Sequence, residues 1–294
     1  MEFGPDKGII LVLGATGHQG GAVARHLLEK KYSVRFMTRK PDSPKAKELE
    51  TLGANPVIGD LDDADAVKAA LSGVRAVFAV FTMAEKGVEW EAATGKRFVK
   101  SALDAGVSHF VYSSVGSADR RTGIPHFESK ARIEEAVRKA GFPSWTILRP
   151  VFFMDNIAGK MTVSGLEEGK LAMGVQPGTR LQMISVEDIG RFGLLAFEKS
   201  AEMNGQSIDI AGDDLTMPEV AEILSRILDR RIDFVSLPQE EVRAISRELA
   251  IMDDWFDRVG YSADIDGIRS KYGIQPLRFE EWAEKVKWSV PIRL

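Results

Sequence analysis

Short apolar runs alternate with helical patterns throughout the first half of this 294-residue chain. The runs are rich in β-branched and aromatic residues, which favours strands, and they cover residues 9–14, 33–38, 55–60, 75–81, 109–114 and 144–150. Amphipathic patterns between them predict helices over residues 18–30, 44–53, 62–72, 88–106 and 126–141. Because the strands are apolar almost throughout, they belong in a parallel sheet that is buried on both faces. We therefore predict an α/β fold with a doubly wound parallel sheet, whose ligand edge gathers the carboxyl ends of the strands.

The pattern changes after Pro150. Helices are expected over residues 186–199, 217–229, 239–250 and 278–288, and short strands over residues 207–212 and 231–237. We expect a first domain of residues 1–155 and a smaller, mostly helical C-terminal lobe of residues 156–294. The strand at 207–212 is expected to rejoin the main sheet. The segment at 253–267, which reads DDWFDRVGYSADIDG, is a candidate lid or interface piece.

The composition excludes several classes of function. A net charge of -4 offers no basic surface to nucleic acid. With 0 cysteines the chain forms no disulfide and no thiolate metal site, and its 4 histidines are scattered without metal-ligand spacing, so we expect no metal. There is no apolar run of membrane-spanning length and no signal-peptide pattern. We expect a cytoplasmic protein, a monomer or a homodimer, that binds neither nucleic acid nor a membrane.

The first apolar run leads directly into GATGHQG, in which Gly14, Gly17 and Gly20 are spaced G-x-x-G-x-x-G. A backbone that turns sharply from a strand into a helix, close to a pyrophosphate, leaves no room for Cβ atoms. The N-terminus of the following helix also offers N–H groups and a partial positive charge to phosphates. The stretch predicts a dinucleotide site of the Rossmann type, with a tight turn that binds nothing as the alternative. The loop residues predicted to contact the cofactor are Gly14, Thr16, Gly17, His18, Gln19 and Gly20.

The second predicted strand ends in FMTRKP. NAD-binding chains usually place an Asp or Glu here, about 20 residues after the glycines, to hold the ribose 2′-hydroxyl. This chain has Arg39 and Lys40 instead, and an arginine can grip a 2′-phosphate with paired N–H donors. The pattern favours NADP(H) over NAD(H), with a solvated basic turn as the alternative.

The third predicted strand ends in GDLDD. Asp60 and Leu61 are positioned to flank the adenine, and the Asp60 carboxylate could accept from its amino group. Asp62 is a candidate N-cap of the following helix.

Five segments carry a resemblance to a known family: GATGHQGG, FMTRKP, GDLDD, HFVYSSVGSAD and HFESKARIEEAVRKAGFPSWTILRPVFFMDN. Together they resemble the NmrA-like family, whose members are atypical short-chain dehydrogenases/reductases. The resemblance is strongest from residue 9 to about residue 160. It implies a Rossmann domain, NADP(H) binding and a smaller C-terminal lobe. It also implies that the cofactor passes the ends of the fourth and sixth strands, where it would meet Phe81, Thr82, Pro150, Phe152 and Phe153.

The stretch VFFMDN after the sixth strand is a candidate substrate pocket. Phe153 and Met154 would form an apolar wall, although aromatic runs of this kind also occur in cores. Asn156 matches an Asn that the family often keeps, and it is a candidate polar anchor for a substrate.

Ordinary reductases of this superfamily use a Ser after the fifth strand and a Tyr-x-x-x-Lys on the next helix. The four-residue spacing places Tyr and Lys on one helix face. Here the segment reads HFESK, so Lys130 is present while His126 stands at the Tyr position. Ser113 and Ser114 both lie near the Ser position, and Ser114 matches better. The resemblance implies catalytic roles for Lys130, His126 and Ser114, with Lys130 also binding ribose hydroxyls; the alternative for His126 is a neutral imidazole that only lines the pocket.

Two functions remain open. One is an NADPH-dependent reductase of a small apolar acceptor, such as a quinone, enal, imine or aromatic ketone, because strong electrophiles accept hydride with little proton assistance. The other is a non-catalytic NADP(H) redox sensor that binds a regulatory protein partner, which the loss of the Tyr favours. Sugar-nucleotide epimerisation is a weaker third reading, since it also needs the Tyr.

Overall fold

The computed structural model describes residue 4 and residues 8–288, and it divides into two compact units. The first unit comprises residues up to Asp119, Pro125–Arg149 and Ile189–Ile208, and the second comprises Arg120–Ile124, Pro150–Asp188 and residues from Asp209 onward. The first unit therefore takes in residues 189–208, which lie beyond the boundary predicted at residue 155.

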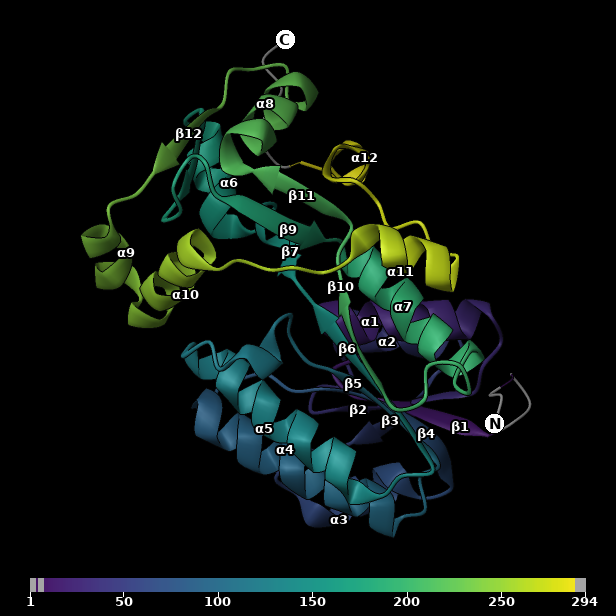
Figure 1. The fold of residues 1–294 in the computed structure, drawn as a ribbon. Coiled ribbons are helices and arrows are strands. Elements are labelled where there is room, and N and C mark those ends of the chain that lie inside the picture. The colour runs from purple at the N-terminus through teal and green to yellow at the C-terminus, as the bar shows by residue number, and fades with distance from the viewer. Residues whose placement is uncertain (1–3, 5–7, 289–294) are drawn as a thin grey trace. The chain divides into compact units, whose positions relative to one another are not determined.

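A seven-stranded sheet in the order β10-β6-β5-β4-β1-β2-β3 confirms the predicted α/β fold (Figure 1). The pairs from β3 through β2, β1, β4 and β5 to β6 are parallel. Their apolar side chains are buried, as a sheet covered on both faces requires. The strands are β1 Ile9–Val12, β2 Val34–Thr38, β3 Asn55–Ile58, β4 Val74–Val80, β5 His109–Ser113, β6 Ser144–Pro150 and β10 Gln206–Ile210. The last of these confirms that the segment predicted at 207–212 joins the main sheet.

Helices cover both faces of this sheet within the first unit (Figure 1). The five helices predicted in the first half are confirmed to within two or three residues at their ends, and α7, predicted over 186–199, is confirmed as well. In Figure 1, α3, α4 and α5 lie on one face, and α1, α2 and α7 on the other. Their bounds are α1 His18–Glu29, α2 Pro44–Thr51, α3 Ala64–Leu71, α4 Gly87–Asp104, α5 Pro125–Ala140 and α7 Val186–Glu198.

Small residues set the close approach of these helices. A Cβ on Gly95 of α4 would lie 2.5 Å from the Ile133 side chain of α5. On the other face, a Cβ on Gly193 of α7 would lie 2.4 Å from Val23 of α1. Both distances are far below normal contact, so each glycine allows two helices to pack more closely than a larger residue would.

The second unit contains more strands than the sequence analysis predicted. A three-stranded sheet has the order β11-β9-β7, and a two-stranded sheet pairs β12 with β8 in parallel. Of these strands the sequence predicts β12 alone. The bounds are β7 Phe152–Phe153, β8 Lys170–Met173, β9 Arg180–Ile184, β11 Asp213–Thr216 and β12 Asp233–Ser236.

The helices of the second unit also differ in part from the prediction. The helices α8 Met217–Ile227 and α12 Phe279–Lys285 are confirmed, whereas α6 Lys160–Glu167 and α11 Ile265–Tyr272 were not predicted. The single helix predicted over 239–250 is wrong. The chain forms α9 Gln239–Ile245 and α10 Arg247–Arg258, because Ser246 is extended and its hydroxyl accepts from the Leu249 N–H as an N-cap. The segment 253–267, predicted as a lid or interface, begins inside α10 and ends inside α11.

Two further features concern the part of the chain that the structure describes. Among its helices, none combines the length with the apolar character that a membrane span requires. No cluster of three or more His, Asp or Glu side chains within residues 4 and 8–288 is arranged to hold a metal ion.

Candidate functional site

A cavity of about 630 Å³ lies at the carboxyl ends of β1, β2, β3 and β4 in the first unit. Its volume falls in the range of small-molecule sites, and its position is the ligand edge of a doubly wound sheet. The cavity also involves the segment after β4, which leads into α4. Among the predicted cofactor residues, the ones that line it are Gly14, Thr16, Arg39, Lys40, Asp60, Leu61, Phe81 and Thr82.

The glycine turn beside this cavity has the geometry that the sequence predicts. Gly14 has a φ of +65°, and the Gly17 N–H donates to the Gly14 carbonyl at 2.8 Å. A Cβ on Gly20 would lie 2.4 Å from the Leu13 carbonyl oxygen, so a larger residue cannot be placed there without moving the backbone. Gly17 is the N-cap of α1 and provides no side-chain cap. The first N–H groups of α1 are therefore available to an anion.

Two further loop residues were predicted to contact the cofactor. His18 is exposed at the first position of α1, and Gln19 is half-buried beside it. The Gln19 side-chain oxygen accepts from Ser113 Oγ at 2.6 Å, which ties the glycine turn to the end of β5. The contacts of both residues with a cofactor stay predictions.

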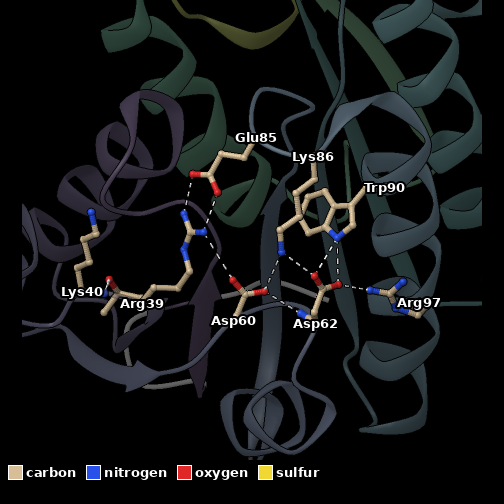
Figure 2. A network of polar contacts seen from close by, with 9 residues as sticks. Arg39, Lys40, Asp60, Asp62, Glu85, Lys86, Trp90 and Arg97 are labelled. Carbon is tan, nitrogen blue, oxygen red and sulfur yellow. Dashed lines mark hydrogen bonds and ion pairs between the residues drawn. The ribbon is translucent and has the colours of Figure 1, made fainter.

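Arg39 and Lys40, the two cations after β2, differ in their ion pairing. Both terminal guanidinium nitrogens of Arg39 donate to the Glu85 carboxylate, each at 2.7 Å, and Asp60 lies 3.7 Å from the same guanidinium (Figure 2). This pairing lowers the pKa of the Glu85 carboxyl. Lys40 also lines the cavity, and its ammonium has no ion-pair partner among the described residues. The cation that was predicted to bind a 2′-phosphate is thus already bound to a carboxylate.

A second group of charges lies at the end of β3 (Figure 2). The Asp62 carboxylate accepts from Lys86 Nζ at 2.7 Å, from Trp90 Nε1 at 3.0 Å and from Arg97 at 2.7 Å. These hydrogen bonds, that of Lys86 first, lower the pKa of Asp62. The prediction that Asp62 caps the next helix is wrong, because the Asp63 carboxylate accepts from the first N–H groups of α3. Asp62 instead anchors α4 at the rim of the cavity.

Lys130 is held by the protein on two sides. Its ammonium donates to Glu91 Oε1 at 2.7 Å and to the carbonyl oxygen of Phe81 at 2.9 Å. The Glu91 side chain is fully buried, and its second oxygen accepts from the hydroxyl of Ser129. An ammonium has three donors. Lys130 therefore has one N–H left over from these contacts, beside the strand end that was predicted to carry the cofactor.

His126 and Lys130 lie four residues apart on α5, as the sequence predicts. His126 is half-buried, and its ring packs edge-on against Phe127 at a centroid distance of 4.8 Å. Its backbone carbonyl accepts from Ser129 Oγ. Neither His126 nor Lys130 lines the cavity, whose walls belong to the adenosine side of the predicted site.

The two candidate serines differ in their contacts. Ser113, the last residue of β5, is buried and donates to Gln19. Ser114 is 3% exposed, and its hydroxyl makes no well-formed hydrogen bond with the described residues, although it interacts with the buried phenol of Tyr112. A buried hydroxyl without a well-formed hydrogen bond is rare in folded proteins. This difference favours Ser114, the better match in the sequence, as the serine that contacts a ligand.

The remaining predicted residues lie between Pro150 and Asn156 and belong to the second unit. Phe152 and Phe153 form β7, which pairs in parallel with β9, and both are half-buried. Met154 is completely buried, which favours a place in the core over a place in a pocket wall. Asn156 is exposed, and its backbone carbonyl accepts from Thr162 Oγ1. The substrate and cofactor contacts proposed for this segment stay predictions.

Sequence reasoning missed Glu85 and Glu91. Glu91 left a signal, because it lies on the buried face of α4 with Gly95, Phe98 and Ala102, a spacing at which an apolar residue is expected. A carboxylate on such a face requires a buried cation. Glu85 left none, since it lies in a loop 46 positions from Arg39 and only the fold brings the two together.

A strand, a glycine turn and a helix, followed by a basic turn and by Lys130 on α5, occur in this order in a known group of proteins. The model of the NmrA-like family matches residues 6–283. The chain belongs to the NmrA-like family.

Two relatives show how far the similarity extends. The chain is 26% identical to an NmrA-like family domain-containing protein of Dictyostelium discoideum, over 96% of this chain and 98% of that protein. It is 31% identical to the NAD(P)H azoreductase of Xenophilus azovorans, over 80% of this chain and 79% of the azoreductase.

Solved structures share the fold of this NmrA-like chain. The triphenylmethane reductase of Citrobacter sp., complexed with NADP(H), superposes with a TM-score of 0.79 at 19% identity, covering 95% of this chain and 99% of the reductase. NmrA, a negative transcriptional regulator in complex with NADP, superposes with a TM-score of 0.78 at 21% identity and 95% coverage of both chains. One fold thus serves an enzyme and a regulator.

Proposed function

We propose that this NmrA-like protein binds NADP(H) at the carboxyl edge of the first unit's sheet. The observation that carries the proposal is the cavity of about 630 Å³ between the glycine turn and Arg39. The residues fit the group. Gly20 leaves the space that a Cβ would fill, the N-terminus of α1 faces the pyrophosphate position, and Arg39 and Lys40 supply positive charge for a 2′-phosphate.

The activity that this site supports best is the NADPH-dependent reduction of a small apolar acceptor, such as a quinone, enal, imine or aromatic ketone. When bound, NADPH supplies a hydride. Lys130 would bind a ribose hydroxyl with its remaining N–H, while Ser114 and His126 are the candidates to donate a hydrogen bond or a proton to the acceptor. The relative named as an NAD(P)H azoreductase and the structural neighbour named as a triphenylmethane reductase support a reductase activity in general.

A redox sensor is the second candidate, and a specific observation favours it. Two of the three Lys130 donors are occupied by Glu91 and the Phe81 carbonyl, and no tyrosine stands four residues before Lys130. This arrangement would hold a cofactor without a tyrosine beside it to donate a proton. The structural similarity to the regulator NmrA supports the same reading. In this case the partner is a regulatory protein rather than a substrate.

Titration calorimetry with NADPH and NADH tests the cofactor proposal. Arg39→Ala should weaken NADPH binding by about tenfold or more, because a paired guanidinium–phosphate contact is lost, and should change NADH binding less than about twofold. Arg132→Ala is the matched control, since Arg132 makes the same two-bond pair with Glu89 outside the cavity. Equal losses for both cofactors would contradict a 2′-phosphate role for Arg39.

The choice between reductase and sensor needs turnover. NADPH oxidation is followed for the wild type and Lys130→Ala across quinones, enals, imines and aromatic ketones. Turnover with one acceptor that falls in the variant supports the reductase. Tight NADPH binding with no turnover on any acceptor supports the sensor.

A further inference from the structure

Arg39 and Glu85 close a contact at the cavity that a 2′-phosphate would have to open. Arg39 follows β2, and Glu85 lies in the loop that precedes α4, yet both side chains line the same cavity. The two hydrogen bonds between them, each 2.7 Å, use both terminal nitrogens of the guanidinium (Figure 2). A phosphate binds arginine through the same pair of donors.

Lys40 lines the same cavity without an ion-pair partner among the described residues, so Arg39 is the cation for which the Glu85 carboxylate and a 2′-phosphate compete. Lys86, next to Glu85, is already held by Asp62 at 2.7 Å and lies 3.9 Å from Asp60. Asp60 also lies 3.7 Å from the Arg39 guanidinium, at one of the two nitrogens that donate to Glu85. A 2′-phosphate arriving here would meet two carboxylates, and it could gain the paired contact with Arg39 only if Glu85 moved away.

Separating Arg39 from Glu85 costs little free energy, because both side chains are exposed. The Arg39 side chain is 53% exposed and that of Glu85 is 58% exposed, so water solvates both groups when they separate. Exposed ion pairs contribute little free energy. The pair Lys130–Glu91, with the same 2.7 Å separation but a fully buried carboxylate, lacks this freedom.

We propose that Glu85 is a specificity-determining residue, an internal competitor that occupies Arg39 until a 2′-phosphate displaces it. The inference rests on the proposed NADP(H) function. Glu85 lowers the affinity for phosphorylated adenosine and leaves the affinity for the unphosphorylated form unchanged. It thereby narrows the preference for NADP(H) over NAD(H) that Arg39 alone would produce.

Calorimetric titration with adenosine 2′,5′-bisphosphate and with 5′-ADP tests this without any need for turnover. Glu85→Gln should bind the bisphosphate about three- to tenfold more tightly than the wild type, because a competing and repelling charge is gone. Binding of 5′-ADP should change less than about twofold. Glu85→Ala should also bind the bisphosphate more tightly, since it removes the negative charge together with the hydrogen-bonding capacity that Gln retains. Glu89→Gln is the matched control, because Glu89 makes a two-bond pair with Arg132 outside the cavity.

The same titrations separate this inference from the function beneath it. In an Arg39→Ala background, Glu85→Gln should change bisphosphate affinity less than about twofold, since the contested guanidinium is absent. If Arg39→Ala weakens bisphosphate binding but both Glu85 variants bind like the wild type or more weakly, the competitor role is overturned and the cofactor proposal stands. If Arg39→Ala has no effect on bisphosphate binding, the 2′-phosphate role of Arg39 and the competitor role of Glu85 are both overturned.

Discussion

Two carboxylates that follow β4 each hold a cation at 2.7 Å, and burial separates their roles. Glu85 and Arg39 are both more than half exposed, while the Glu91 side chain is 0% and that of Lys130 13% exposed. Water can replace either partner in the first pair at little cost. In the second pair, loss of one partner leaves an uncompensated buried charge. The same distance therefore marks an exchangeable contact in one place and a fixed one in the other.

This contrast suits a site that must both hold and release a ligand. The exposed pair lines the cavity that is proposed to take the adenosine side of the cofactor. The buried pair fixes Lys130 against the Phe81 carbonyl, beside the predicted ribose position. Rigidity around Lys130 and adaptability around Arg39 are thus properties of burial and not of the residue types involved.

The strongest test of the contrast is Glu91→Gln. It leaves Lys130 without a countercharge in a buried place, so we expect a loss of about 3–5 kcal/mol in the free energy of unfolding. Urea denaturation measures it, at low salt and in about 1 M NaCl, and the loss should be the same in both because buried charges are poorly screened. Glu89→Gln, on the exposed side of α4, is the control and should leave the urea midpoint unchanged. A loss for Glu91→Gln as small as that of the control would mean that Lys130 is not held as described.

His109 sharpens the comparison, because it is a buried titratable group that bonds to two neutral groups. Its ring bonds to the Ser144 hydroxyl and to the Ala196 carbonyl, and burial lowers its pKa from 6.5 to about 4. The contribution of neutral His109 to the free energy of unfolding is fully present above the unfolded-state pKa of 6.5. It is lost as the pH falls towards 4, by about 3 kcal/mol in all.

Urea denaturation of the wild type and His109→Asn between pH 7.5 and 4.5 measures this loss. The variant should be less stable at pH 7.5 and should approach the wild type as the pH falls. Parallel pH profiles for the two proteins would contradict the assignment to His109.

The smallest effect is expected for Asp62→Asn in the exposed group of charges. The hydrogen bonds from Lys86, Trp90 and Arg97 lower the pKa of Asp62, so its contribution is present above the unfolded-state pKa and lost as the pH falls through the lowered value. We expect a decrease in the thermal midpoint at neutral pH that is smaller than that of Glu91→Gln and that disappears in about 1 M NaCl. Asp104→Asn, which removes one exposed partner of Lys100 on the same helix, is the control. A decrease that persists at high salt would place Asp62 with the fixed contacts.

Local patterns determined most of the first unit. Continuous apolar runs require strands buried on two faces, and the helical patterns between them require parallel connections, so the sheet and its ligand edge followed from residues 9–150. The glycine turn followed as well, because a Cβ at Gly20 would overlap the Leu13 carbonyl in any chain that folds this way.

The second unit was predicted less well for a physical reason. Its strands β7, β8 and β11 have two to four residues each, too few to show a period, and they become strands by pairing with partners far away in the sequence. The break between α9 and α10 could have been predicted from the sequence, since a serine before a helical pattern, here Ser246, is a recognised N-cap signal.

The sequence by itself determined the α/β fold, the position of the dinucleotide edge and the presence of Arg39, Lys40 and Lys130 near it. Only the tertiary structure decided which carboxylate each cation meets. Glu85 reaches Arg39 across 46 positions and Glu91 reaches Lys130 across 39; the helical pattern marks Glu91 as buried, but no local pattern names the cation that either carboxylate meets. The charge of each side chain follows directly from the sequence, whereas the strength of each ion pair depends on burial, which is a property of the packed molecule.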